Sequence, residues 1–236
     1  MKISVCMATY NGEKYIQEQL ESILSQLGKN DEVIISDDNS TDNTRTIVEN
    51  LNDSRIKSFI NQKAKGYTRN FENSLEKVTG DIIFLADQDD VWIDTKVEKT
   101  VKELEKYDFV VSDNEIVDEK LNLIEKSHFG VYNTKQGFIR NLLLPRYVGA
   151  CMAFRKEVLS KSLPFPSNEK LSAHDYWICL IAELSFSVHL ISEPLVKYRR
   201  HDSNTSNGGA KSSNSLKHKF QVRFYTLYQL IKRLNR

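Results

Sequence analysis

The sequence predicts an α/β fold in which helices flank a mostly parallel sheet. In the first half of the chain, short apolar runs alternate with segments whose apolar residues recur at helical spacing. Clusters of Asp and Asn follow several of these runs, as expected where a strand turns into a helix. Strands that alternate with helices pair in parallel, because each helix carries the chain back to the edge where the strand began.

The first half contains five predicted strands and four predicted helices. The strands are Ile3–Ala8, Glu32–Ser36, Arg55–Ile60, Asp81–Ala86 and Phe109–Ser112. The helices are 12–27, a segment ending near Leu51, 69–78 and Asp94–Tyr107. In the first helix, apolar residues fall at helical spacing from Ile16 to Leu27, and Gly28 follows as a C-cap.

The second half is less regular. We predict a polar hairpin over Asp118–Lys126, a helix over 135–144, a strand over Tyr147–Phe154, a helix over Leu171–Leu184, and strands over Ser187–Ile191 and Leu195–Tyr198. Asp202–Ser215 is rich in Ser, Asn and Gly, which is typical of a flexible loop. We therefore divide the chain into a domain over 1–205, with halves 1–113 and 114–205, and a tail over 206–236.

Composition limits the class of protein. The 236 residues are 40% hydrophobic and 28% charged, which excludes a disordered chain, a collagen-like repeat and a small disulfide-stapled protein. The three cysteines are an odd number without a C-x-x-C pair, so we expect buried, reduced thiols in a cytoplasmic protein. We see no signal peptide, and no apolar run approaches the roughly 18 residues of a membrane span.

Charge is unevenly distributed. The formal net charge is +1, but Lys211–Arg236 holds seven basic residues and no acid. This leaves 26 basic residues against 32 acidic ones in residues 1–210, so nucleic-acid binding is not favoured. An apolar stripe at helical spacing crosses the tail: Leu216, Phe220, Phe224, Leu227, Ile231 and Leu234. A basic amphipathic helix of this kind suits an anionic membrane surface; packing on the domain or on a partner subunit of a homo-oligomer is the alternative.

Polar side chains gather where three of the predicted strands end. Ligands of open α/β sheets bind at the carboxyl ends of strands, although Asp and Asn are also common turn residues. After the fourth strand, Asp87, Asp89 and Asp90 place three carboxylates within four residues. Such carboxylates repel one another unless a cation compensates, and oxygen ligands suit Mg²⁺ or Mn²⁺ shared with a diphosphate.

Three linked motifs carry a resemblance to a known family. SVCMATYNG (residues 4–12), ISDDNSTD (35–42) and FLADQDDVW (84–92) closely resemble glycosyltransferase family 2. The resemblance covers residues 1–205 and implies the GT-A fold and inverting transfer of a sugar from a nucleotide donor. The D-Q-D-D-x-W variant, with H-D-x-W and Y-R-x-H downstream, is similar to bacterial rhamnosyltransferases of surface-polysaccharide synthesis.

The resemblance also implies roles for individual residues. It assigns donor binding to the first half and acceptor binding to residues 114–205, with a glycan or lipid-linked acceptor. The implied donor-binding residues are Thr9, Tyr10, Asp38, Gly66, Asn70, Asp87 and Gln88. Asp89 and His201 are the implied ligands of Mg²⁺ or Mn²⁺, and Arg199 or Arg200 is a candidate partner of the diphosphate.

Asp175 matches the position of the family's catalytic base. The family has an acidic residue before this Asp, whereas this chain has His174, as does the rhamnosyltransferase-like subgroup. The reaction needs one carboxylate within reach of the acceptor hydroxyl. Without the resemblance, Ser172 or Asp175 would be interpreted as a helix cap worth ~1 kcal/mol.

Two other functions remain open at this point. A sugar nucleotidyltransferase also needs an α/β domain and acidic metal ligands, but a Gly-rich loop should follow its first strand, where this chain has Thr-Tyr-Asn-Gly. A non-catalytic nucleotide-sugar-binding module would bind a donor without turnover. A dehydrogenase is disfavoured because G-x-G-x-x-G is absent.

Overall fold

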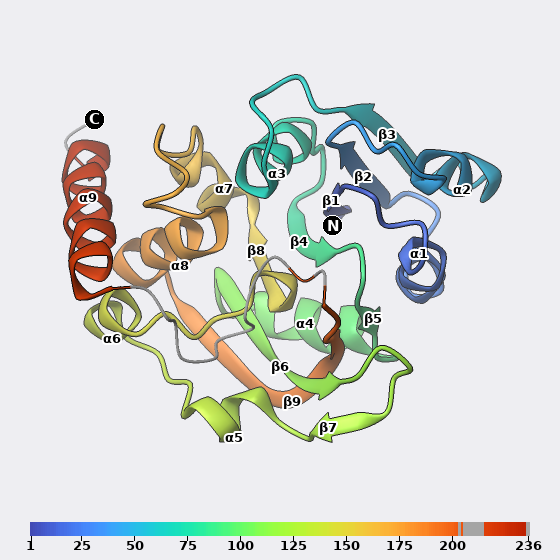
Figure 1. Ribbon diagram of the computed structural model, residues 1–236. Helices are drawn as coiled ribbons and strands as arrows, with labels where there is room; N and C mark the ends of the chain where they lie inside the picture. Colours follow the sequence, from blue (N-terminus) through green and yellow to red (C-terminus); the bar gives the residue numbers. More distant parts are fainter. Residues whose placement is uncertain (203, 205–214, 235–236) are drawn as a thin grey trace.

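A nine-stranded sheet crosses the whole molecule (Figure 1). The computed structural model describes residues 1–202, 204 and 215–234. The strands are β1 (Ile3–Thr9), β2 (Glu32–Asp37), β3 (Ile56–Ile60), β4 (Ile82–Asp87), β5 (Val91–Trp92), β6 (Phe109–Val117), β7 (Leu123–Glu125), β8 (Met152–Arg155) and β9 (Val188–Arg199). Their order is β3-β2-β1-β4-β8-β6-β9-β5, and β7 pairs with β6.

Helices flank this sheet. They are α1 (Ile16–Leu24), α2 (Thr44–Asn50), α3 (Tyr67–Leu75), α4 (Lys96–Leu104), α5 (His128–Tyr132), α6 (Phe138–Leu143), the 3₁₀ turn η1 (Gly149–Cys151), α7 (Lys156–Ser162), α8 (His174–Ser185) and α9 (Leu216–Leu234). In Figure 1, α1 and α2 lie at one edge of the molecule, and α9 lies at the opposite edge beside α6 and α8. The α/β class with a helix in the basic tail is confirmed.

Parallel pairing is confined to part of the sheet. Strands β3, β2, β1 and β4 are all parallel, as the alternation of strands and helices predicts. Beyond β4, β8 lies antiparallel between β4 and β6, β9 is parallel to β6, and β5 is antiparallel to β9. The sheet is therefore mixed as a whole, because the second half lacks the regular crossover helices of the first.

The core lies on both faces of the central strands. Every residue of β2 is buried, and β1 and β4 are buried along nearly their full length, so their continuous apolar runs reflect helices on both sides. The three cysteines are buried and free, as expected, and burial raises the pKa of the Cys151 thiol to about 12.

Several elements differ from the prediction. Tyr147–Phe154 is not one strand, because η1 occupies Gly149–Cys151 and β8 begins only at Met152. The two strands predicted after Phe186 form the single strand β9, whose register against β6 shifts around Asp113. Three short elements, β5, α5 and α7, were not predicted, since runs of two to seven residues carry little periodicity.

The predicted division of the chain is only partly visible. One sheet runs through both predicted halves, and β6 crosses the boundary set at residue 113, so the division stays a prediction. The loop predicted over Asp202–Ser215 falls largely outside the described residues. None of the helices in the described part of the chain combines the length and apolar character that a membrane span requires.

Candidate active site

The carboxyl ends of β1, β2 and β4 meet at one edge of the sheet. Thr9 pairs in register with Asp37, and Ala8 pairs with Asp87. Gln88 joins the loops that follow: its Oε1 accepts from Tyr10 N at 2.9 Å and its Nε2 donates to Tyr10 O at 3.1 Å. The fold therefore brings together the polar residues that follow β1, β2 and β4, as the sequence predicts.

Gly12 lies beside this junction, and its lack of a side chain leaves room for the Gln88 amide. A Cβ on Gly12 would lie 2.4 Å from Gln88 Oε1, closer than atoms can approach. The amide of Gln88 is thus held between two loops, and it positions the backbone of Tyr10. Thr9 likewise joins two strand ends, since its buried hydroxyl donates to Asp37 Oδ2 at 2.8 Å.

Asp38, Gly66 and Asn70 form the side of the site next to β3. Asp38 Oδ2 accepts from Gly66 N at 2.9 Å, and its Oδ1 accepts from Asn61 Nδ2 at 2.9 Å. Gly66 has a φ of +124°, a backbone conformation that L side chains rarely adopt. Asn70 is buried on α3, and its Nδ2 donates to Thr9 O at 3.0 Å. Asp38 thereby fixes the loop before α3 against the end of β2.

Tyr10 is the exposed member of this group. Its side chain is 49% exposed, and the Lys65 ammonium lies 5.9 Å from its ring centroid. An aromatic ring held at a strand end beside a cation can stack on a flat ring of a ligand. The structure thus places Tyr10, Asp38, Gly66 and Asn70 around one rim, with Tyr10 open to a ligand.

The Asp87–Asp90 cluster meets the end of β9. Asp89 Oδ2 lies 2.9 Å from His201 Nε2 and accepts from Asn204 Nδ2 at 3.2 Å. The His201 ring packs on Tyr15, with 4.8 Å between the ring centroids. Asp89 and His201 are therefore adjacent although 112 residues separate them in the chain.

Four carboxylates interact electrostatically in and around this cluster, those of Asp87, Asp89, Asp90 and Asp175. Burial raises the pKa of Asp87 to about 7, and the neighbouring charges of Asp89 and Asp175 add to the rise. Burial also raises the pKa of Asp90, with further contributions from Asp89 and Asp87. Asp175 comes from α8, so its charge acts on Asp87 from a different element of the fold.

These groups fit a divalent cation. A carboxylate and an imidazole are suitable ligands, and the mutual repulsion of the carboxylates is what a cation would relieve. Among residues 1–202, 204 and 215–234, no cluster of three or more His, Cys, Asp or Glu side chains is placed to hold a metal by itself. A cation on Asp89 and His201 would keep coordination positions for water and phosphate oxygens, as Mg²⁺ usually does.

Arg199 holds the Asp87–Asp90 cluster through hydrogen bonds, a role that the sequence analysis did not predict. Its Nε donates to Asp89 O at 2.8 Å and its Nη1 donates to Glu119 O at 2.8 Å, while its backbone N–H donates to Asp90 Oδ1. The side chain is buried, and its guanidinium also lies 4.8 Å from the Tyr15 ring centroid. Arg199 is thus committed to protein groups. Arg200 instead lines a cavity of about 450 Å³ beside His201.

Asp175 lies in the first turn of α8. Its Oδ1 accepts from Tyr176 N at 2.7 Å, and its charge contributes to raising the pKa of Tyr67 to about 12, where burial is the main cause. A Cβ on Gly149 would lie 3.2 Å from Asp175 Cβ, so the small residue at η1 lets α8 approach. Ser172 makes no cap, since its hydroxyl has no partner among the described residues.

His174, which replaces the acidic residue of the family pattern, is buried. Its ring stacks on Phe71 at 4.1 Å between centroids, and burial lowers its pKa. Neither ring nitrogen has a hydrogen-bond partner within the described ranges. The imidazole is therefore neutral and serves packing. Of His174 and Asp175, only Asp175 can act as a base of the kind that the family pattern requires.

Four residues of the site were not predicted. Asn204, Tyr15 and Glu119 surround His201 and Asp89, and Gly149 contacts Asp175. Asn204 comes three residues after His201 of the Y-R-x-H motif, and this nearness is the sequence signal that could have found it. The others come from distant segments whose contacts depend on the fold.

Comparison with known proteins settles the family. The family model described as Glycosyl transferase family 2 matches residues 4–163. The chain belongs to this family. A dTDP-rhamnosyl transferase, RfbG of Shigella flexneri, is 30% identical over 231 residues, which cover 90% of this chain and 77% of that protein.

A second relative acts on a lipid-linked acceptor by its description. The GalNAc(5)-diNAcBac-PP-undecaprenol beta-1,3-glucosyltransferase of Campylobacter jejuni is 29% identical over 194 residues, or 80% of this family 2 chain. The aligned part spans only 62% of that relative's length.

Solved structures confirm the GT-A fold. TarS 1-349 of S. aureus, in complex with UDP-GlcNAc, has a TM-score of 0.74 at 21% identity, covering 98% of this chain and 67% of TarS. Mannosyltransferase PcManGT of Pyrobaculum calidifontis, with GDP-Man and Mn²⁺, has a TM-score of 0.64 at 23% identity, covering 81% of this chain and 54% of that one. Proteins of this fold thus occur with a nucleotide sugar and a divalent metal.

Proposed function

We propose that this family 2 enzyme transfers a sugar, with inversion, from a nucleoside-diphosphate sugar to an acceptor hydroxyl in bacterial surface-polysaccharide synthesis. The approach of Asp89 and His201 to 2.9 Å at the end of β4 carries the proposal, and the electrostatic influence of Asp175 on Asp87 supports it. Asp87 and Asp89 are suited to bind a cation and a diphosphate, and Asp175 is suited to accept a proton. A sugar nucleotidyltransferase would have no use for the carboxylate on α8.

The donor would lie across the strand ends. Tyr10 would stack on the base, and Asp38 with the Gly66 loop would contact the base and ribose; Thr9, Asn70 and Gln88 would hold this rim in place. Asp87 would hold the ribose or diphosphate. Asp89 and His201 would hold Mg²⁺ or Mn²⁺, which neutralises charge that develops on the leaving diphosphate.

Asp175 would act as the general base. The acceptor oxygen attacks the anomeric carbon as the bond from that carbon to the diphosphate oxygen breaks, through an oxocarbenium-like transition state. The acceptor proton moves to an oxygen of Asp175, and the bond's electron pair leaves with the nucleoside diphosphate. A base opposite the leaving group gives inversion, and the neutral His174 adds no competing charge beside it.

The relatives suggest which substrates to try. Their descriptions name dTDP-rhamnosyl transfer and an undecaprenyl-diphosphate-linked glycan. We therefore propose a dTDP- or UDP-sugar as donor and a glycan on a lipid diphosphate as acceptor. Such an acceptor lies in a membrane, so the enzyme would work at the inner face of the cytoplasmic membrane.

Donor binding is the first experiment. A ligand that binds only the folded state raises its stability, so the melting temperature should rise with the correct donor. UDP-glucose, UDP-GlcNAc, dTDP-rhamnose and GDP-mannose would each be tested with Mn²⁺, with Mg²⁺ and with EDTA. Metal-dependent stabilisation by one donor is expected, and no response to any of the four would contradict the proposal.

Turnover separates the enzyme from a binding module. The stabilising donor would be incubated with a synthetic glycosyl diphosphate carrying a short isoprenoid, and the product's anomeric configuration would be determined by NMR. An inverted linkage supports the proposal. Binding without transfer would favour the non-catalytic module, and a retained configuration would exclude Asp175 as a simple base.

A further inference from the structure

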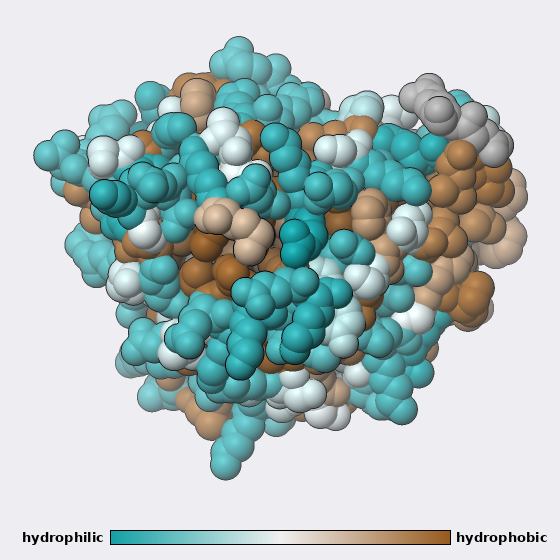
Figure 2. Space-filling view, turned by 180° about the vertical axis from the view of Figure 1, so that it is seen from behind, coloured by the Kyte–Doolittle hydropathy of each residue, from teal (hydrophilic) through white to brown (hydrophobic). Residues whose placement is uncertain are grey.

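Helix α9 exposes the apolar stripe that its sequence predicts. The stripe consists of Leu216, Phe220, Phe224, Leu227, Ile231 and Leu234; Leu216 is 85% exposed, Phe220 70% and Phe224 66%. The Phe220 and Phe224 rings stack, with 6.3 Å between centroids. Figure 2 shows hydrophobic surface gathered at the edge of the molecule where α9 lies. A continuous exposed face of this kind marks an interaction site.

A neighbouring face of α9 is already fixed to the domain. Thr226 and Leu230 are fully buried, and Thr226 Oγ1 donates to Leu171 O at 3.1 Å. Arg233 donates to Lys161 O in the last turn of α7 at 3.0 Å and to carbonyl oxygens just after that helix, and its guanidinium lies 5.5 Å from the Trp177 ring centroid. The helix therefore packs through its less apolar face, and the stripe points away from the molecule in a set orientation.

The exposed surface continues onto α6. Arg223 donates to the carbonyl oxygen of Leu143, which joins the end of α6 to the first half of α9. Ile139 and Leu144, on and just after α6, are 64% and 52% exposed. Figure 1 places α6 directly beside α9. Two elements thus contribute apolar side chains along the same edge.

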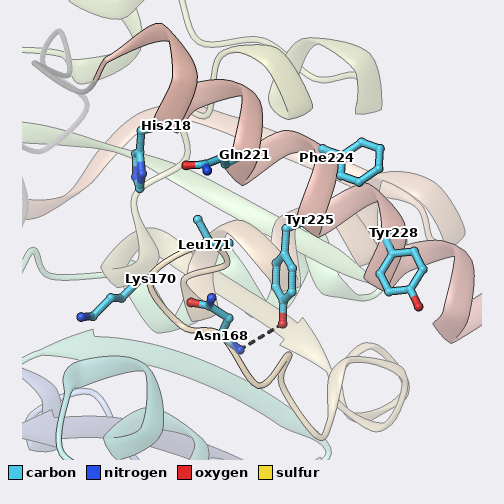
Figure 3. A pocket seen from close by; sticks show the side chains of 8 residues that line it. All are labelled: Asn168, Lys170, Leu171, His218, Gln221, Phe224, Tyr225 and Tyr228. Carbon is cyan, nitrogen blue, oxygen red and sulfur yellow. Dashed lines mark hydrogen bonds between the residues drawn. The ribbon is translucent and has the colours of Figure 1, made fainter.

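One flank of the stripe is cationic. Lys217 and Lys232 are exposed on α9, and the segment from Lys211 to Arg236 contains no acid. A cavity of about 460 Å³ opens on the same flank, between α9 and residues 168–171 (Figure 3). Lys170 and His218 lie at one end of it, and Phe224 and Tyr228 at the other. Phe224 belongs to both the stripe and the cavity.

We infer that α9 is a membrane-binding face, which lies flat on an anionic lipid bilayer. The stripe would enter the boundary between headgroups and acyl chains, while Lys217 and Lys232 would contact lipid phosphates. Lys170 and His218 would meet headgroup phosphates at the mouth of the cavity. A helix with exposed apolar residues beside cations, and with no acid of its own, complements an anionic bilayer.

A second copy of the chain is a poorer occupant. Two-fold pairing of the stripe with itself would bring Lys217 and Lys232 of both copies together, and the tail has no carboxylate to neutralise them. The membrane inference uses no role proposed for Asp89 or Asp175. It agrees with a lipid-linked acceptor but does not depend on one, so either proposal can fail alone.

The test replaces exposed side chains and keeps the helix, because deleting α9 would uncover the core around Leu230. Phe220→Gln/Phe224→Gln would be compared with the wild type for flotation with vesicles of phosphatidylglycerol and phosphatidylcholine in equal parts. We expect at least about a tenfold loss of binding. Leu123→Gln/Ile124→Gln, on the 48% and 53% exposed side chains of β7, is the matched control and should bind as the wild type does.

The charge contribution has its own variant. Lys217→Gln/Lys232→Gln should reduce binding to the mixed vesicles, leave the weak binding to pure phosphatidylcholine unchanged, and weaken the dependence on salt. Lys29→Gln/Lys106→Gln, at exposed sites elsewhere, should change nothing. Melting temperatures should be unaltered in all four variants, since every replaced side chain is exposed.

Two results would overturn the inference. One is equal vesicle binding by the wild type and Phe220→Gln/Phe224→Gln. The other is a wild-type dimer, measured by light scattering, that this variant converts to a monomer, which would identify the stripe as a subunit interface.

Discussion

At the scale of single residues, Asp175 separates chemistry from binding. Asp175→Asn keeps the shape of the side chain and its bond with Tyr176 N, but the amide cannot take a proton. We expect the transfer rate to fall by roughly 10²–10⁴-fold, the usual contribution of a general base. Donor affinity should remain, because the rim around Asp38 and Gly66 is untouched. Single-turnover kinetics and donor-induced melting shifts measure the two effects.

A near-normal rate in Asp175→Asn would exclude the base role. Asp113 and Glu193 would then be the carboxylates to test next, although both already have protein partners. Asp113 is buried and accepts from Phe129 N at 2.9 Å, and Glu193 pairs with Lys99. An equal loss of melting temperature and rate would instead indicate that the carboxylate serves the helix start.

Gly149 tests whether the position of Asp175 matters. In Gly149→Ala the new methyl group would meet Asp175 Cβ at 3.2 Å, so the first turn of α8 must shift by a few tenths of an ångström. We expect about a tenfold fall in kcat, since misplaced catalytic groups lose rate steeply, with the donor Kd unchanged. Gly28→Ala is the control, because its methyl group would meet only the Asp31 carboxylate. Equal kinetics for both variants would contradict this positioning.

At the scale of elements, β9 supports the proposed metal site through Arg199. Lys cannot reproduce the planar donors that reach Asp89 O and Glu119 O together. Arg199→Lys should therefore weaken metal-dependent donor binding and lower the free energy of unfolding by about 2–4 kcal/mol. Isothermal calorimetry with Mn²⁺ and donor, beside urea unfolding, would measure both. Arg45→Lys, at an exposed site on α2, is the control. An Arg199→Lys variant with wild-type affinity would show that Asp89 needs no support from β9.

The same scale shows what a sequence can and cannot predict. The strands of the first half follow from periodicity, because buried parallel strands are continuous apolar runs. Two features of the second half do not follow from periodicity. One is η1, where Gly149 lies close to Asp175 of α8. The other is the single strand β9, whose register against β6 shifts around Asp113. For α9, periodicity correctly predicts an amphipathic helix, but it does not say which face the domain covers.

The candidate site divides in a similar way. The motifs bring Asp89 and His201 together in the fold, 2.9 Å apart, while the roles assigned to them and to Asp175 stay predictions. Arg199 looked like a free cation for the diphosphate, since a sequence cannot tell a buried guanidinium from an exposed one. Its bonds to Asp89 O and Glu119 O join segments 80 or more residues apart.

At the scale of the whole molecule, a buried lysine links stability to pH. Lys96, on α4, is 1% exposed, and its ammonium lies 5.1 Å from the Trp92 ring centroid. Its nitrogen has no hydrogen-bond partner in the part of the chain that the structure describes. Burial lowers its pKa from 10.5 to about 8, although the charges of Cys151 and Asp90 oppose this. The folded protein therefore releases the proton at a lower pH than the unfolded chain does.

The sign of the effect follows from proton binding. Between pH 8 and 10.5 the unfolded chain holds a proton that the folded one has lost, so stability rises with pH over this window. We expect the free energy of unfolding of the wild type, relative to Lys96→Met, to increase by about 2 kcal/mol from about pH 7 to about pH 10. Urea titrations at both pH values measure this difference, and the exposed Lys106→Met is the control. A difference that does not change with pH would mean that Lys96 keeps an ordinary pKa, with its ammonium hydrated in the folded protein.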